Sequence, residues 1–142
     1  MPLHRRALLT TFVGVLANHK PLQAQELISG LVGPAGARLE PGPVGEHRVY
    51  FQGSTQGLKS LIVGSLSLKP GQQPHPPHTH EDEEVIVLVE GTGEINLNGK
   101  SSRVGPGEVM YAVPNCLHGV RNTGSTRLTL YYFKWIAKRS FA

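Results

Sequence analysis

The chain has little of what several large protein classes require. Its single cysteine, Cys116, excludes an internal disulfide. No apolar run approaches the ~20 residues that a transmembrane helix needs. Arg5, Arg6 and Lys20 are three of the 14 basic residues and no acidic residue precedes Gln25, so residues 25–142 carry 11 basic and 10 acidic residues. A near-neutral body without a basic stripe argues against nucleic acid as a partner.

Helical periodicity is equally scarce, because only the N-terminal segment and residues 25–31 suggest it. The 17 glycines and 11 prolines instead separate short apolar-rich runs, a pattern typical of a β-sandwich or barrel. Asn98-Gly99 lies between two such runs and predicts a type I′ hairpin. We therefore expect one all-β domain over residues 47–137, a jelly roll or small barrel. Its predicted strands lie near residues 47–52, 59–68, 83–90, 93–97, 100–104, 109–113, 118–122 and 127–136.

Two segments precede this domain. Residues 1–24 have the order of a signal peptide, with Arg5-Arg6, a mildly apolar stretch and a small residue at Ala24. The arginine pair resembles a twin-arginine signal, although Leu8 stands where that signal usually has Phe. We expect a periplasmic or secreted protein, cleaved after Ala17 or Ala24; the alternative is an amphipathic helix of a cytoplasmic protein. Residues 25–46 are rich in Gly and Pro and predict an irregular arm.

A cluster of potential metal ligands lies in the middle of the chain. His78, His80 and Glu84 share one parity, so a single extended strand would direct all three side chains to one face. His118 can supply a third imidazole. Such nitrogen-rich ligation suits Fe, Mn, Ni, Cu or Zn and does not suit Mg or Ca. Four protein ligands on an octahedral ion would leave two positions for water, O2 or a chelating small molecule.

Two motifs around these ligands resemble the signatures of the cupin superfamily. They are Gly71-x6-His78-x-His80-x3-Glu84-x6-Gly91 and Gly107-x5-Val113-x-Asn115-x2-His118-x3-Asn122. The first motif has one extra residue before His78, and Val113 and Asn115 replace the usual proline and glycine. The resemblance implies a double-stranded β-helix, a jelly-roll cupin barrel, with one metal held inside by His78, His80, Glu84 and His118. It also implies dimeric packing.

The same parity assigns residues to the two faces of the predicted barrel. Ile86 and Leu88 should continue the ligand face inward, and the apolar stripe of Val85, Val87 and Val89 should face outward. The arm, the opposing sheet or a second subunit must cover this stripe, and a homodimer is the preferred interpretation. Around the site we expect a solvated His75 and a buried, inert Cys116. Packing in the core or at a subunit interface is expected for Tyr131, Phe133 and Trp135.

Two classes of function fit these features. The first is a small metalloenzyme that acts on a small oxygen-bearing molecule as a dioxygenase, isomerase, decarboxylase or lyase. The second is a cupin that binds a metal or small ligand for sensing, storage or carriage. Open metal positions favour the enzyme, because a structural metal is enclosed by protein ligands. No catalytic residue is evident in the sequence. Arg103, Arg121 and Arg127 lie at positions where a loop or the outer face is as plausible as the interior of the barrel.

Overall fold

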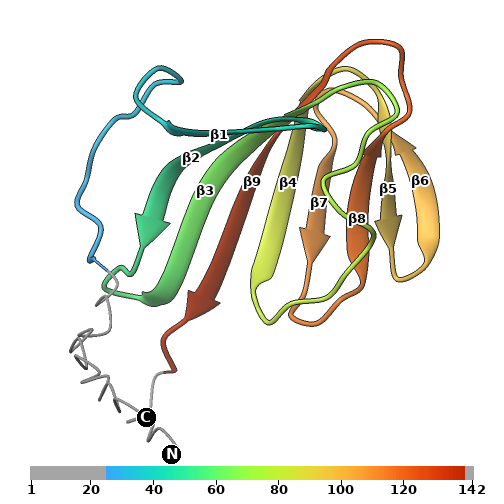
Figure 1. Ribbon diagram of the computed structural model, residues 1–142. Coiled ribbons are helices and arrows are strands. Elements are labelled where there is room, and N and C mark those ends of the chain that lie inside the picture. Colours follow the sequence, from blue (N-terminus) through green and yellow to red (C-terminus); the bar gives the residue numbers. More distant parts are fainter. Residues whose placement is uncertain (1–24, 140–142) are drawn as a thin grey trace, which may run out of the picture.

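The computed structural model describes residues 25–139 and consists of strands joined by short turns (Figure 1). Over this range there is no helix, and therefore none that could span a membrane. The strands are β1 (Arg38–Gly42), β2 (Gly45–Gly53), β3 (Leu58–Leu68), β4 (Glu83–Glu90), β5 (Gly93–Leu97), β6 (Lys100–Val104), β7 (Val109–Ala112), β8 (His118–Asn122) and β9 (Leu128–Ala137). The prediction of an all-β domain is confirmed, and each predicted strand coincides with an observed one to within about two residues.

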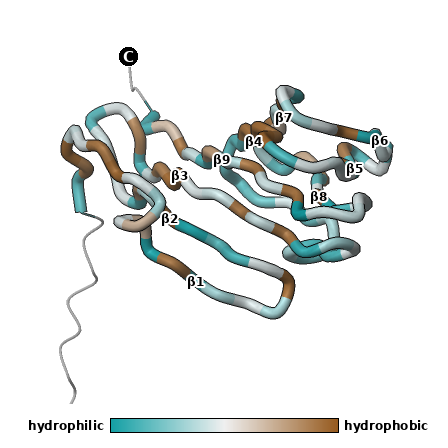
Figure 2. Tube along the Cα trace, turned by 90° about the horizontal axis from the view of Figure 1, so that it is seen from above, coloured by the Kyte–Doolittle hydropathy of each residue, from teal (hydrophilic) through white to brown (hydrophobic). Residues whose placement is uncertain are grey.

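The strands form two antiparallel sheets that face each other as a β-barrel. The large sheet has the order β1-β2-β3-β9-β4-β7, and the small sheet has the order β6-β5-β8. Seen from above, β1 and β2 lie at the opposite end of the large sheet from β7 (Figure 2). The turn between β5 and β6 has positive φ at Asn98 (52°) and Gly99 (80°), as the predicted type I′ hairpin requires.

The prediction for residues 25–46 was only partly right. Residues 25–37 contain no strand, but Arg38–Gly42 forms β1, which pairs with the first half of β2. The Gly and Pro residues hid this edge strand, because Pro41 and Gly42 are disfavoured in strands yet tolerated at an edge where no further partner needs their N–H groups. The helical period at residues 25–31 was also misleading: Gln25 and Leu27 instead hydrogen-bond to Ser54, beyond the end of β2.

The core lies between the two sheets and is built from the inward positions of the strands. Its fully buried members are large aliphatic residues of β3, β4 and β9, and the cluster around them extends onto β5, β7 and β8. Ile86 and Leu88 are 4% and 1% exposed, which confirms their inward assignment. Near the starts of β4 and β8 the buried inward positions are polar instead, at Glu84 and His118.

Candidate metal centre

The three candidate histidines converge although they do not share a strand. His78 and His80 precede β4, in the loop between Leu68 and Glu83, so of the three residues that share a parity only Glu84 lies on a strand. His78 instead pairs with His118 at the start of β8, with backbone hydrogen bonds of 2.9 and 3.0 Å in the two directions. The His80 carbonyl also accepts a 2.7 Å hydrogen bond from the Asn115 N–H. The loop is therefore held against the start of β8 at His78 and against the turn between β7 and β8 at His80.

The side chains of these residues form a compact cluster of potential ligands. One nitrogen from each of His78, His80 and His118 lies within 4.8 Å of the other two. Oε2 of Glu84, on the inward face of β4, is 2.9 Å from His80 Nε2 and 2.8 Å from His118 Nε2. Glu84 is 7% exposed and His118 is 3% exposed. The cluster is compatible with a metal site, and Glu84 lies beside two of its three imidazoles.

The orientation of His118 is set by the turn that precedes it. Nδ1 of His118 donates a 2.9 Å hydrogen bond to the Cys116 carbonyl, which leaves Nε2 facing Glu84. A backbone acceptor on the far nitrogen is the usual way in which a ligand histidine is oriented. The Cys116 side chain is buried, as expected, and its thiol lies 3.3 Å from Asn98 Oδ1, which accepts a hydrogen bond from it.

Two ring nitrogens of the cluster lack a hydrogen-bond partner. Nδ1 of His78 and Nδ1 of His80 are both buried without one, although the latter lies 3.4 Å from Asp82 Oδ2, and an unsatisfied buried nitrogen is costly unless something binds it. Burial lowers the pKa of His78, and the adjacent His75, His118 and His80 lower it further, against an opposing effect of Glu84. His75 is exposed, as expected, and its ring lies edge-on to His78 at a centroid distance of 3.9 Å. His78 is thus kept neutral, the form that binds a metal.

An open cavity of about 220 Å³ adjoins the cluster. The apolar part of its wall comes from core residues such as Ile86 and Leu130, and the polar part includes His47, Tyr132 and Lys134 in addition to His78, Glu84 and His118. This volume suits a small molecule, since drug-sized ligands occupy about 300–1,000 Å³. The cavity therefore places titratable side chains around a space next to the three imidazoles.

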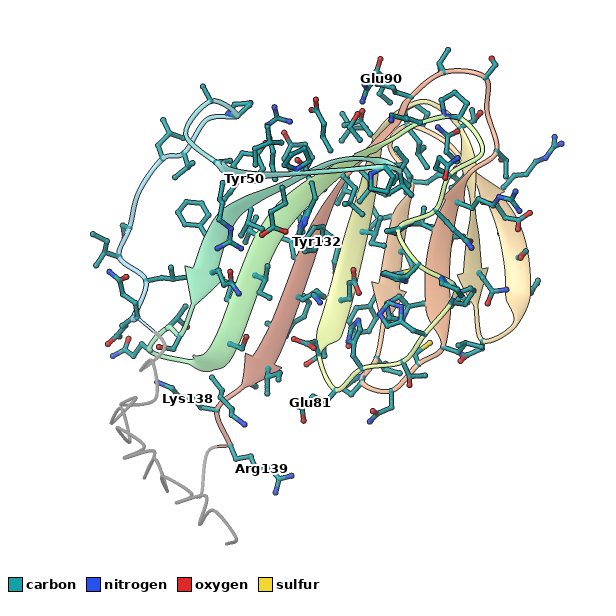
Figure 3. The ribbon with its side chains drawn as sticks, in the orientation of Figure 1. Tyr50, Glu81, Glu90, Tyr132, Lys138 and Arg139 are labelled. Carbon is teal, nitrogen blue, oxygen red and sulfur yellow. The ribbon has the colours of Figure 1, made fainter. Side chains whose placement is uncertain are left out.

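Tyr132, which is labelled in Figure 3, begins a hydrogen-bonded chain that leads from this wall to the surface. Its hydroxyl donates to His47 Nε2 at 2.5 Å, and His47 Nδ1 donates to Glu40 Oε2 at 2.9 Å. Burial raises the pKa of Tyr132 to about 12, with contributions from the negative charges of Glu84 and Glu40 and an opposing one from Arg38. Tyr132 is therefore a neutral phenol whose hydroxyl donates a hydrogen bond to the His47 imidazole.

The sequence did not single out Tyr132, Lys134 or His47 as cavity residues. The first two could have been found by parity, because they alternate on β9 with Tyr131, Phe133 and Trp135, which face the other side. His47 had no such signal, since its position depends on the pairing of β2 with β3. The three arginines weighed in the sequence, Arg103, Arg121 and Arg127, are all exposed.

Asn122, the last residue of the second motif, is fully buried and serves the fold. Its side chain donates to the carbonyls of Leu68 and Thr126 at 2.9 and 2.8 Å, and accepts from the Gly124 N–H at 3.0 Å. Its backbone also pairs with Gly71 and Gln72. Asn122 thus anchors the start of the loop that carries His78 and His80.

Comparison with known families agrees with this geometry. The family model described as a cupin domain matches residues 64–134, half of the chain, which include the cluster and strands β4 to β8. The chain belongs to the cupin family. No curated protein matches the chain.

Solved cupin structures share the fold at low sequence identity. An RmlC-like cupin from Shewanella frigidimarina superposes with a TM-score of 0.64 at 17% identity, covering 85% of this chain and 100% of that one. KdgF from Halomonas sp. superposes with a TM-score of 0.62 at 19% identity, covering 80% and 97%. A sugar phosphate isomerase from Silicibacter pomeroyi superposes with a TM-score of 0.50 at 18% identity, covering 53% and 50%. These likenesses establish the fold.

Proposed function

We propose that this cupin binds one divalent transition metal through His78, His80, Glu84 and His118 and acts on a small oxygen-bearing molecule. The observation that carries the proposal is the convergence of three imidazoles and one carboxylate beside an open cavity. The donor set suits Fe, Mn, Ni, Cu or Zn. The buried, unpartnered nitrogen of His78 and the backbone-oriented ring of His118 support a site built for an ion.

The bound ion would supply Lewis-acid polarisation of substrate oxygen atoms. The chain's own residues would select and orient the substrate. Lys134 brings a positive charge to the same cavity, which favours a substrate with an anionic or strongly polar oxygen. The small volume excludes large ligands. Isomerase or lyase chemistry on a small hydroxylated compound fits these features, and the fold of a sugar phosphate isomerase is among the similar ones.

Elemental analysis of the protein purified from its own host tests the metal site. A transition metal at a ratio of about one per chain is expected, because four ligand residues surround one position. Replacing His118 with Ala should reduce this ratio strongly, whereas His47→Ala, outside the cluster but in the same cavity, should leave it unchanged. Equal metal content in the parent and in the His118 variant would refute the site. A metal-loaded protein that binds small hydroxy acids without converting them would be a binding cupin rather than an enzyme.

We also propose a homodimer that covers the outer face of the large sheet. On this face the half-buried Val85 and Val87 lie between Tyr131 and Phe133 of β9 and more exposed residues of β7. The exposed apolar members are Val89, Val109, Tyr111 and Val113, which are 48%, 62%, 49% and 53% exposed. The arm cannot serve as their cover, because residues 25–27 hydrogen-bond beyond the end of β2, far from β4 in the sheet order. Light scattering at micromolar concentration tests the dimer.

Export remains a proposal that stands on the sequence alone, since residues 1–24 lie outside the described residues. The arginine pair, the mildly apolar stretch and Ala24 support it. N-terminal sequencing of the protein from its host should begin near Gln25 or Asn18. Intact protein starting at Met1 in the cytoplasm would refute export.

A further inference from the structure

A continuous chain of hydrogen bonds runs from the cavity wall to the surface of the barrel. It begins at the Tyr132 hydroxyl, passes through both nitrogens of His47 and reaches the Glu40 carboxylate. Arg38 Nε donates a 3.1 Å hydrogen bond to the other oxygen of Glu40. The buried fraction falls along this path, because Tyr132 is 7% exposed, whereas the side chains of His47 and Glu40 are 32% and 48% exposed. These hydrogen bonds therefore link the enclosed Tyr132 hydroxyl to solvent.

The sheet makes room for this arrangement at Gly64. Gly64 on β3 is the direct partner of Tyr132 on β9, and a Cβ atom there would lie 2.4 Å from the Tyr132 ring and hydroxyl. The absence of a side chain lets the Tyr132 ring lie across β3 and reach His47 on β2. A tyrosine packed for apolar contact alone would not need a route to an imidazole two strands away. The position of its hydroxyl is thus determined by the backbone of three adjacent strands.

We propose that Tyr132, His47 and Glu40 form a proton relay that deprotonates a small α-hydroxy carbonyl compound held in the cavity. This inference rests on the proposed function, because the substrate's two oxygens would be held at the metal position. The substrate C–H bond next to the carbonyl breaks, and its electron pair moves to the carbonyl oxygen. The proton passes to Tyr132 Oη as the hydroxyl proton of Tyr132 passes to His47 Nε2.

Glu40 completes the relay as a positioning residue. The His47 Nδ1–H remains bonded to the carboxylate, which holds the accepting nitrogen toward Tyr132 and stabilises the imidazolium that forms. In the enediolate that forms, the substrate's own hydroxyl proton moves to the former carbonyl oxygen. Reversal of the two relay transfers then delivers the abstracted proton to the former carbonyl carbon, which converts the hydroxy ketone into its hydroxy aldehyde isomer. No oxidant or other co-reactant is required. The charged groups near the relay are Arg38 and Glu40 from β1, Glu84 from β4 and Lys134 from β9.

Acetohydroxamic acid is a suitable probe of this relay. Its anion carries two neighbouring oxygens and one negative charge, as the deprotonated α-hydroxy carbonyl compound does, and the acid loses one proton when it chelates a metal. The experiment measures binding to the full-length, Zn²⁺-loaded protein by titration calorimetry in buffers of different ionisation enthalpy, which reports the protons released to the buffer. It is performed near pH 8, about 1.5 units above the ordinary histidine pKa of about 6.5.

The relay predicts that the parent protein retains the probe's proton on His47. Tyr132→Phe and His47→Gln should each release about one proton more per bound probe than the parent. Tyr111→Phe is the matched control, because it removes a tyrosine hydroxyl bonded to Glu83 on the outer face, and it should behave like the parent. Glu40→Gln should fall between the parent and His47→Gln.

The outcomes separate the relay from the metal site. Equal proton release by the parent and both cavity variants, with normal binding of the probe, would overturn the relay and leave the proposed function intact. Failure of the Zn²⁺-loaded parent to bind the probe would reject the open metal site, and the relay with it. Circular dichroism checks that each variant folds, and His47→Gln alone decides the result if Tyr132→Phe does not fold.

Discussion

The two faces of the large sheet are made from alternate residues of the same strands, yet the polarity of each face is partly the reverse of the usual one. On β4, Glu84 points into the barrel while Val85 points outward; on β9, Tyr132 points inward while Tyr131 points outward. A sheet with one buried face ordinarily places apolar residues inside and polar residues outside. Here a region of the inner face is polar and the outer face is apolar. The inner departure supports the proposed site for a small ligand, and the outer one supports the proposed dimer.

The polar inner region is tolerated because most of its groups are paired. The Tyr132 hydroxyl is hydrogen-bonded to His47, and both ring nitrogens of His47 and of His118 have partners. Nδ1 of His78 and Nδ1 of His80 are the exceptions in this cluster. The outer face has no such internal solution, because Val109 and Val113 can be removed from water only by another molecule. Each face can therefore be tested by changes that leave the other untouched.

The largest expected effect is on the inner face. Replacing His78, His80 and His118 together with Ala should abolish metal binding, since only Glu84 would remain of the four proposed ligands. Glu84→Gln should weaken binding while preserving the fold. Metal content measured by mass spectrometry of the purified proteins checks both. As a control on the outer face, Tyr111→Phe should keep the full metal content; a loss in this variant too would mean that the two faces are not independent.

Acid should remove the metal from the same face. Burial and the neighbouring imidazoles lower the pKa of His78, so its neutral form is favoured in the folded state. The unfolded chain therefore binds more protons just below the ordinary histidine pKa of about 6.5. The stability from this group is present above that pH and is lost as the pH falls through the lowered value. We expect metal loss below about pH 6, measured by dialysis at stepped pH, and retention of metal well below that would contradict imidazole ligation.

The sequence predicted the ligand cluster better than the hydrogen-bonded chain beside it. The strands and the four candidate ligands followed from short-range patterns: apolar alternation, Asn98-Gly99 and the spacing around His78 and His118. The hydrogen-bonded chain did not, because His47 reaches Tyr132 only through the pairing of β2, β3 and β9, and a bulge between Val49 and Phe51 changes the register of β2. Long-range register leaves little trace in local sequence. β1 was missed for a different reason, because Pro41 and Gly42 are disfavoured in strands and hid an edge strand that pairs only with β2.

A smaller effect is expected from crowding the inner face at Gly64. In Gly64→Ala the new methyl group would meet the Tyr132 ring at 2.4 Å, so the ring must move and its bond to His47 must lengthen or break. Overpacking of this kind costs about 1–3 kcal/mol of unfolding free energy. Urea unfolding of the metal-free protein measures the change. Gly57→Ala is the matched control, because nothing lies within 4 Å of its added atom, and a loss of stability as large as that of Gly64→Ala would discount the contact with Tyr132.

The smallest effect on the fold, and a decisive one for the outer face, is expected from Val109→Lys. Val109 is 62% exposed on β7, so in a monomer a lysine there would remain in water and change stability by no more than about 0.5 kcal/mol. In a dimer that buries this face, two lysines would be brought together near the symmetry axis or against apolar groups, and burying an unpaired charge is costly. We therefore expect Val109→Lys to shift light scattering from a dimer to a folded monomer. Leu39→Lys, at a 45% exposed position on β1 away from this face, should leave the dimer intact. A parent protein that is already monomeric would refute the dimer, and the apolar outer face would then not be covered by a second copy of the chain.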